Sequence, residues 1–367
     1  MGGRQTRAYG TYAIALAMTV VTLAGCGSGD DSSDVAAPPP SDPDAPATGT
    51  LHTFTYGDTV SDPLVDPFLA ANPDLDLQTA TFDSVQAGAA KVAGGFKTDV
   101  IQPCADEYQP LIQRNILQPI DPDGIENWDE LKFRDSEGIL RDDGLVNFVP
   151  IAAGPQGIIY NTDEVSEPPT SWADLFDPQY AGRAGIDGGT YLTPIAEAGM
   201  AMGVSDPMAM TDEEVEEAKV FLIDHRDQFR SFISSDADKV NLFKSGEIVI
   251  SDGGRGSAKA LQDAGVPVEW VAPEEGAMAW VCGLGITADA ENIDAAYKLI
   301  NYYVSDEGQE LIAQGGLTVV NPSVMPSIPK EFRFTADPSS LTDVIAEVQP
   351  DNYQTWVRAW QEVKAGG

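Results

Sequence analysis

Apart from carboxylates, few side chains in this sequence could carry out acid, base or nucleophilic chemistry. The 367 residues include two histidines, His52 and His225, and three cysteines, against 58 aspartates and glutamates. His225 falls at the end of a predicted helix, where the helix dipole favours a positive charge, so we assign it a structural role. Because carboxylates are so abundant, no single pair of them indicates an acid–base dyad.

The motifs of the common enzyme classes are also missing from the sequence. There is no H-E-x-x-H, no paired C-x-x-C, no G-x-S-x-G and no G-x-x-x-x-G-K-[ST]. The glycine-rich run at 253–257 lacks the lysine of a phosphate-binding loop. We therefore predict that the protein is not an enzyme and uses no metal or other cofactor.

Cys26 follows a segment that is typical of protein export. Two arginines precede an uncharged run from Tyr12 to Ala24, which has the length of a signal-peptide core and is too short to span a bilayer. The run leads into Leu-Ala-Gly-Cys, which resembles the bacterial lipoprotein signal, in which the cysteine becomes the lipid-bearing N-terminus. We predict that residues 1–25 are removed and that Cys26 anchors the exported protein at the outer face of the cytoplasmic membrane.

The next segment, residues 26–49, has no aromatic side chain and consists mostly of Gly, Ser, Asp, Pro and Ala. Such a segment cannot bury enough apolar surface to fold, so we predict a disordered linker. The remaining chain is long enough for two domains. Its acidic residues are spread along it, and the formal net charge is −37. That charge argues against nucleic acid as a partner; it attracts a cationic ligand or serves solubility, and the sequence leaves both open.

Short β-rich runs alternate with helical stretches after residue 50, which is the pattern of an α/β protein. The predicted strands are Leu51–Tyr56, Leu75–Phe82, Asp99–Gln102, Gly157–Tyr160, Glu247–Ser251, Pro267–Val271 and Cys282–Thr287. The predicted helices are Pro63–Asn72, Val85–Ala93, Tyr108–Arg114, Ser171–Phe176, Pro194–Met202, Thr211–His225, Asp236–Ser245, Gly256–Ala264, Ile293–Val304, Asp306–Gln314 and Tyr353–Ala365. Thr211 with Glu214 forms a capping-box pattern, and Asn292 and Ser305 are cap-like residues.

Cys104 and Cys282 remain once Cys26 carries a lipid. Both are flanked by turn-like residues, and an exported protein meets an oxidising compartment. The sequence therefore favours a disulfide between them over two free thiols.

Several short phrases occur in one order along the chain. They are T-D-V-I at 98–101, L-Q-P-I-D at 117–121, V-P-I at 149–151, I-I-Y-N at 158–161, P-T-S-W-A-D-L at 169–175, Q-Y-A-G-R at 179–183, F-K-S-G-E at 243–247, P-E-E-G at 273–276 with Trp280, and A-Y-K-L-I-N at 296–301. Together they resemble the spermidine/putrescine-binding proteins of ABC importers, over essentially all of residues 50–366. The phrase at 169–175 and the one that ends in Trp280 are the most specific.

The resemblance implies an α/β, two-lobed fold like that of the type II periplasmic binding proteins, with mixed sheets flanked by helices and a hinge. Lobe one would comprise residues 50–157 plus 283–321, and lobe two residues 158–282 plus 322–367. A small-molecule ligand would bind between the lobes, and lobe closure would create the shape that an ABC permease and its ATPase recognise. The receptor would act as a monomer.

In the family, aromatic walls hold the methylene chain of the ligand and carboxylates hold its ammonium groups. Tyr56 and Asp58 match the first contact segment, where Tyr56 would stack and Asp58 would pair with a cation; alternatively, the segment is a turn with a surface aspartate. Trp280 matches an aromatic wall, and the alternative is a core tryptophan.

Three residues in or next to the implied cleft depart from the family pattern. Cys104 and Asp106 lie where the family favours a serine and a tyrosine, and Cys282 lies where it has a ligand-binding aspartate. A disulfide between Cys104 and Cys282 would therefore form the floor of the pocket near the hinge, where we expect it to stabilise the fold by about 2–4 kcal/mol.

The acidic contacts expected on lobe two are also changed. Asp187, Thr190 and Tyr191 lie in the matching segment, which has no carboxylate at the aligned positions. By the resemblance, Asp187 would substitute for these carboxylates from a nearby position. Asp252 and Arg255 lie where the family has a tryptophan before its Gly-Ser-Ala phrase. The resemblance thus covers the scaffold better than the polyamine pocket.

Two kinds of ligand remain open at this point. The leading hypothesis is a receptor for a small organic cation, polyamine-like by the resemblance. The rival ligand is a zwitterion or anion held by Arg255 and the backbone amides of 188–190, a run that is otherwise a tight turn. A sensor subunit with the same fold is a further alternative.

Overall fold

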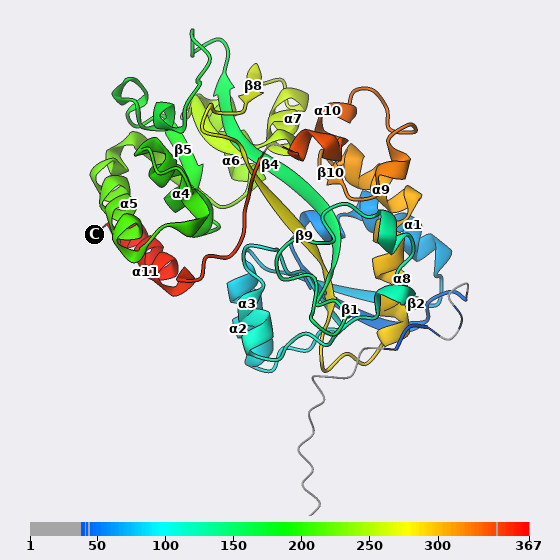
Figure 1. The fold of residues 1–367 in the computed structure, drawn as a ribbon. Helices are drawn as coiled ribbons and strands as arrows, with labels where there is room; N and C mark the ends of the chain where they lie inside the picture. Colours follow the sequence, from blue (N-terminus) through cyan, green and yellow to red (C-terminus); the bar gives the residue numbers. More distant parts are fainter. Residues whose placement is uncertain (1–37, 41, 43–44, 343, 367) are drawn as a thin grey trace, which may run out of the picture. The chain divides into compact units, whose positions relative to one another are not determined.

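The computed structural model describes residues 38–40, 42, 45–342 and 344–366 (Figure 1), so Cys26 and the predicted signal peptide lie outside the described residues. The strands are β1 (Gly49–Thr55), β2 (Leu75–Thr81), β3 (Val100–Ile101), β4 (Val149–Asn161), β5 (Ala184–Asp187), β6 (Phe229–Ile233), β7 (Ile250–Gly254), β8 (Val268–Val271), β9 (Met278–Ile286), β10 (Thr318–Val319) and β11 (Ile345–Ala346). The helices are α1 (Asp62–Ala71), α2 (Val85–Ala93), α3 (Gln109–Gln113), α4 (Leu192–Ala201), α5 (Asp212–Asp224), α6 (Asp236–Ser245), α7 (Arg255–Asp263), α8 (Ile293–Val304), α9 (Asp306–Gln314), α10 (Arg333–Ala336) and α11 (Tyr353–Ala365).

The strands form mixed sheets in the order β2-β1-β3-β9-β4-β7-β5-β6, with β8 and β10 also paired to β4 and β11 paired to β9. β1 runs parallel to β2 and β3, and β5 runs parallel to β6 and β7, whereas β9 is antiparallel to β3 and β4. Each parallel group is covered by helices, as strand–helix–strand crossovers require.

The long strands β4 and β9 connect the two ends of this arrangement (Figure 1). The first part of β4 pairs with β9, and its second part, from Gln156, pairs with β7 and β8. β9 begins beside β4 and ends beside β3. The two strands therefore cross between the lobes and supply the hinge.

The buried side chains gather around the two ends of the hinge strands. One set includes Leu51, Phe148 and Tyr297, beside a neighbouring set around Phe54 and Leu111. The other includes Trp172, Ile195 and Trp356, with a neighbouring set around Ile159 and Phe243. We keep the lobe boundaries 50–157 plus 283–321 and 158–282 plus 322–367 as a proposal.

The three helix caps that the sequence predicts, at Thr211, Asn292 and Ser305, are confirmed. Thr211 accepts a hydrogen bond from the Glu214 amide, and the Glu214 carboxylate accepts one from the Thr211 amide. The side chains of Asn292 and Ser305 cap α8 and α9. Residues Trp172–Phe176 form a 3-10 helix rather than an α-helix, again with a capping box, at Ser171.

The structure contains several strands that the sequence patterns do not predict: β5, β6, β10, β11 and the first half of β4. Pro150, Gly154 and Pro155 argue against a strand, because proline donates no ladder hydrogen bond. β4 accommodates this composition with a shift in register between Pro150 and Ala152. In the described part of the chain, no helix has the length and apolar character needed to cross a membrane.

Candidate ligand-binding site

A disulfide joins Cys104, which follows β3, to Cys282 in the hinge strand β9. The backbone supports it on both sides, because the Ala105 amide donates to the Val281 carbonyl and the Gly283 amide donates to the Pro103 carbonyl. The segment 103–107 is thereby held on the hinge strand. This geometry agrees with the pairing expected from the sequence.

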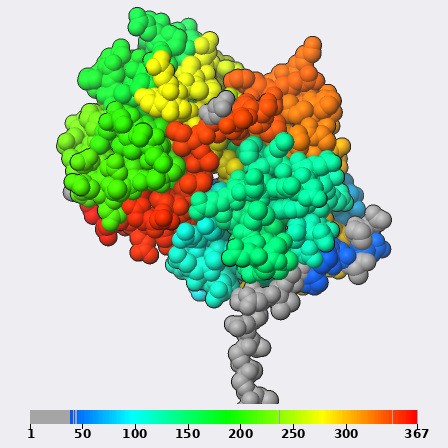
Figure 2. Space-filling model, viewed as in Figure 1, coloured from blue at the N-terminus to red at the C-terminus, as the bar shows by residue number. Residues whose placement is uncertain are grey.

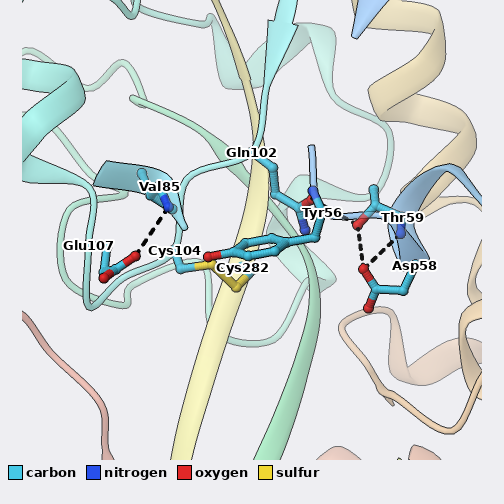
Figure 3. The surroundings of a disulfide bond; sticks show 8 residues. All are labelled: Tyr56, Asp58, Thr59, Val85, Gln102, Cys104, Glu107 and Cys282. Atoms are coloured by element: carbon cyan, nitrogen blue, oxygen red, sulfur yellow. Dashed lines mark hydrogen bonds between the residues drawn. A yellow bond between two sulfur atoms is a disulfide. The ribbon is translucent and has the colours of Figure 1, made fainter. Parts of the chain in front are cut away.

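The Tyr56 ring lies beside the disulfide, with its hydroxyl on the side of Glu107 (Figure 3). The Tyr56 amide donates to Gln102 Oε1 over 3.0 Å, and the ring packs edge-on against Phe82. Burial, followed by the charges of Glu107 and Asp106, raises the pKa of the Tyr56 hydroxyl well above its usual value. The Tyr56 side chain is therefore a neutral ring whose hydroxyl lies on the side of Glu107.

Asp106 and Glu107 follow the disulfide directly, and both are buried. Glu107 Oε2 accepts from the Val85 amide at the start of α2, where the helix dipole favours a negative charge. Burial nevertheless raises the pKa of Glu107 to about 8 and that of Asp106 to about 6. The desolvation of Glu107 thus raises its pKa by more than the hydrogen bond from the Val85 amide lowers it.

Lobe two contributes a second pair of carboxylates, one from Asp187 at the end of β5 and one from Asp252 in the middle of β7. Asp252 Oδ2 accepts from the Asp187 amide over 2.7 Å, and Asp252 Oδ1 accepts from the Ser251 hydroxyl over 3.0 Å. Asp187 Oδ1 accepts from the Gly189 amide over 2.6 Å. Burial, followed by the charge of Asp252, raises the pKa of Asp187 to about 6.

Lys239 of α6 is the only buried lysine or arginine among residues that the structure describes. Its Nζ donates to the Asp252 carbonyl over 2.9 Å and lies 3.8 Å from Asp252 Oδ1. This ammonium partly neutralises the lobe-two carboxylates, because an opposite charge at that distance in a buried setting is strongly favourable.

Two further carboxyl groups complete the set. Glu197 of α4 is 0% exposed, and Glu347, which follows β11, is 3% exposed. The Glu347 amide donates to the Ala279 carbonyl, so the backbone of Glu347 is held beside the hinge strand β9. Burial, followed by the charges of neighbouring carboxylates, raises the pKa of both groups well above the usual value.

We call these carboxyl groups the acidic cluster: Asp106, Glu107, Asp187, Glu197, Asp252 and Glu347. Charged groups removed from water require opposite charges or hydrogen bonds, and the one buried lysine leaves most of the cluster uncompensated. Among the described residues, no three acidic, histidine or cysteine side chains converge as a metal site requires.

Hydrogen bonds join the two lobes beside the acidic cluster. The Tyr191 hydroxyl lies 3.4 Å from the Asp106 carbonyl, the Gln109 amide donates to Gln349 Oε1, and the Tyr353 hydroxyl donates to Gln113 Oε1. A pocket of about 10 Å³, lined by Gln86, Glu107, Pro110, Tyr191, Tyr353 and Val357, remains at the seam. In Figure 2 the C-terminal segment (red) lies between the green and the cyan parts of the surface.

Trp280 lies in the hinge strand β9 and is half-buried. Its indole rests on the backbone of Gly154 in β4, since a Cβ atom there would meet the ring at 2.6 Å. It also packs against the core set that contains the disulfide and Tyr56. Trp280 thus has both a packing role and a position near the aromatic wall.

The structure does not bring every predicted residue to the cluster. Asp58 is exposed and accepts from the Thr59 amide, on the opposite side of Tyr56 from Glu107 (Figure 3). The Thr190 hydroxyl accepts from the Leu192 amide at the start of α4. Ligand contacts by these two residues stay predictions.

Arg255 is engaged elsewhere in the structure. Its guanidinium lies between the rings of Trp270 and Phe334, at 4.6 and 4.5 Å from their centroids, and donates to the Ser340 hydroxyl over 2.7 Å. The Gly189 amide, which was also predicted to bind an anionic ligand, already donates a hydrogen bond to the Asp187 carboxylate. These partners weaken the case for an anionic ligand.

The sequence analysis did not identify four residues of the candidate site: Glu107, Glu197, Glu347 and Lys239. Glu197 had a readable signal, because it is the one charged residue in the apolar run L-T-P-I-A-E-A-G-M-A. Glu107 directly follows Asp106, which the sequence analysis names as a candidate site residue. Nothing in the local sequence distinguishes Lys239 from other helix-surface lysines.

The chain matches the family of bacterial extracellular solute-binding proteins over residues 63–341, and it belongs to that family. It is 27% identical over 369 residues to spermidine/putrescine-binding periplasmic protein 1 of Haemophilus influenzae, covering 96% of this chain and 98% of that protein. It is 25% identical to the putrescine-binding periplasmic protein PotF of Escherichia coli, covering 86% and 92%.

Solved structures share the fold. The spermidine/putrescine ABC transporter substrate-binding protein PotD from Streptococcus pneumoniae superposes with a TM-score of 0.69 at 20% identity, covering 87% of this chain and 99% of that one. The binding protein MotA of A. tumefaciens B6, solved with glucopine, gives 0.71 at 18% identity, covering 86% and 100%. The two-lobed periplasmic-binding-protein fold predicted from the sequence is thus confirmed.

We expect the free energy of unfolding of the ligand-free protein to fall as the pH rises from about 5 to about 8. Asp106, Asp187 and Glu107 have raised pKa values in the folded state, of about 6, 6 and 8. In that window the folded protein holds more protons than the unfolded chain, so deprotonation costs stability. Urea unfolding at constant ionic strength measures this.

Glu107→Gln should flatten the fall between pH 6 and 8, whereas Glu213→Gln, which changes an exposed residue of α5, should leave it unchanged. A stability that stays constant or rises over this range would contradict the proposed environment of the cluster.

Replacing both Cys104 and Cys282 by serine should lower the free energy of unfolding by about 2–4 kcal/mol, because the unfolded chain is then no longer cross-linked. Urea unfolding with and without reductant measures this, and the reductant should affect only the parent protein. Alkylation of both cysteines in the denatured, unreduced protein would show that the bond is absent.

Proposed function

We propose that the protein is the extracellular receptor of an ABC importer and that it captures a small organic cation, polyamine-like, between its lobes. The observation that carries this proposal is the acidic cluster: carboxyl groups from both lobes and the hinge enclosed with a single lysine. A ligand that brings ammonium groups supplies the missing opposite charges.

Several other features support a cationic ligand. Tyr56 and Tyr191 place aromatic surface beside Asp106 and Glu107, which suits a methylene chain that ends in an ammonium group. The relatives in Haemophilus influenzae and Escherichia coli are named for binding spermidine or putrescine. The carboxylates of this chain stand at positions other than those expected from the family, so the ligand need not be the same molecule.

Delivery to a permease and its ATPase follows from the family and from the hinge strands β4 and β9, which allow the lobes to open and close. The lipid on Cys26 would hold the monomeric receptor near the permease, which raises its effective concentration there. A sensor would use the same site, and co-purification with a permease separates the two roles.

A thermal-shift panel tests the ligand class. At pH 8, putrescine and spermidine should raise the melting temperature, while succinate and sodium chloride at equal ionic strength should not. A ligand at a hundredfold excess over its Kd stabilises the folded protein by about 2.7 kcal/mol. If neither amine has an effect while an anion does, the cation proposal is wrong.

Trp280→Ala should weaken binding of the stabilising amine by about tenfold, because the indole supplies apolar contact and cation–π attraction. Isothermal titration calorimetry measures this, with Trp270→Ala, a half-buried tryptophan beside Arg255, as the matched control. Equal affinity of both variants would assign Trp280 to hinge packing alone.

A further inference from the structure

A lysine occupies an inward position on α6 in lobe two. Lys239 is 8% exposed and lies four residues before the buried Phe243, so the two side chains share the inner face of the helix. Lysine is rarely buried without an opposite charge, because the removal of an ammonium group from water is costly. The place of Lys239 in the interior of lobe two therefore requires a carboxylate beside it.

Asp252 of β7 supplies this opposite charge. Lys239 Nζ donates to the Asp252 carbonyl over 2.9 Å and lies 3.8 Å from Asp252 Oδ1. Gly253 leaves room for the contact, since a Cβ atom there would lie 2.9 Å from the lysine Nζ. Asp252 is 1% exposed, so the two charges compensate each other in a place removed from solvent.

The carboxylate of Asp252 in turn takes the place of a backbone acceptor. The parallel pairing of β5 with β7 ends at Gly185 and Ser251. Beyond that point the Asp187 amide donates to Asp252 Oδ2 over 2.7 Å, and Asp252 Oδ1 accepts from the Ser251 hydroxyl over 3.0 Å. The direction in which the chain leaves β5 thus depends on the Asp252 carboxylate.

The segment that leaves β5 faces lobe one. The Asp187 carboxylate accepts from the Gly189 amide over 2.6 Å. A Cβ atom at Gly189 would lie 3.3 Å from Asp187 Oδ1 and 4.0 Å from the carbonyl oxygen of Asp83, which precedes α2 in lobe one. The Tyr191 hydroxyl, from the same segment, lies 3.4 Å from the Asp106 carbonyl. These distances place Asp187 at the seam between the lobes.

Asp252 and Asp187 therefore differ in what they can contact. The enclosed carboxylate of Asp252 already has an amide, a hydroxyl and the Lys239 ammonium as neighbours. Asp187 is half-buried at the seam, where a group bound between the lobes can reach its carboxylate.

We propose that Lys239 and Asp252 are positioning residues that hold segment 187–191 so that the Asp187 carboxylate faces the cationic group of the ligand. This inference rests on the proposed function, and it names the residues that orient the ligand contact on lobe two. By its charge alone, an ammonium group close to a cation site weakens binding. The effect of Lys239 through Asp252 has the opposite sign, so the two effects can be told apart by measurement.

Isothermal titration calorimetry with putrescine at pH 8 makes this measurement. Lys239→Met should weaken binding by about tenfold, as when one hydrogen bond to a charged group is lost, because Asp252 loses its opposite charge and no longer holds the Asp187 amide in place. Lys244→Met, which removes a lysine from the exposed side of the same helix, should leave the affinity unchanged. Unchanged or tighter binding by Lys239→Met would overturn the positioning role.

Two double variants test the same role without leaving a buried charge, and they serve if Lys239→Met alone does not fold. Lys239→Met with Asp252→Asn removes both charges but keeps an oxygen that can accept from the Asp187 amide, so it should restore most of the affinity. Lys239→Met with Asp252→Ala has no such acceptor, and its affinity should stay low. Equal affinities of the two double variants would show that the acceptor does not position Asp187.

The outcomes distinguish this inference from the proposed function. If the parent protein binds putrescine and these variants bind it equally well, the positioning role is wrong and the cation receptor stands. If the parent protein binds neither putrescine nor spermidine, both proposals are overturned.

Discussion

The removal of carboxyl groups from water with too few opposite charges is the constraint on which the rest of the structure depends. Burial raises the pKa of Glu107 to about 8 and acts in the same direction on Glu197 and Glu347. In isolation such a cluster opposes folding, because like charges repel and desolvation is costly. Under the proposed function, a ligand with ammonium groups would offset both effects, so that ligand binding and lobe closure would stabilise each other.

The carboxyl groups of the acidic cluster repel one another, so other parts of the fold must hold them in place. The disulfide and the flanking backbone hydrogen bonds hold the segment of Asp106 and Glu107 against β9, and the pairing of β11 with β9 places Glu347 beside the same strand. In lobe two, Asp187 stands at the end of β5 and accompanies Asp252 of the neighbouring parallel strand β7. Strand ends of this kind are the usual location of ligand sites in α/β sheets. Hinge and site thus share one strand, which links ligand contact to lobe closure.

Local patterns predicted most of the regular elements. Capping residues and helical periodicity located α5, α8 and α9, because those signals act within one turn of the chain. Local sequence patterns did not predict the strands whose conformation depends on pairing with distant segments of the chain. β5 has only the four residues Ala184–Asp187, one of them glycine, and becomes a strand because β6 and β7 flank it. The first half of β4 contains two prolines and extends because β9 pairs with it along its length.

The sequence by itself predicted the class of protein and favoured the pairing of Cys104 with Cys282, since these follow from short phrases and from a small number of cysteines. It did not determine which carboxylates form the site. With 58 aspartates and glutamates, each is locally equivalent to the next. Only the tertiary structure separates Glu197, enclosed without a partner, from Glu213 on an exposed helix face. The reason is physical: burial and electrostatic environment arise from segments that are separate in the sequence and come together only in the folded protein.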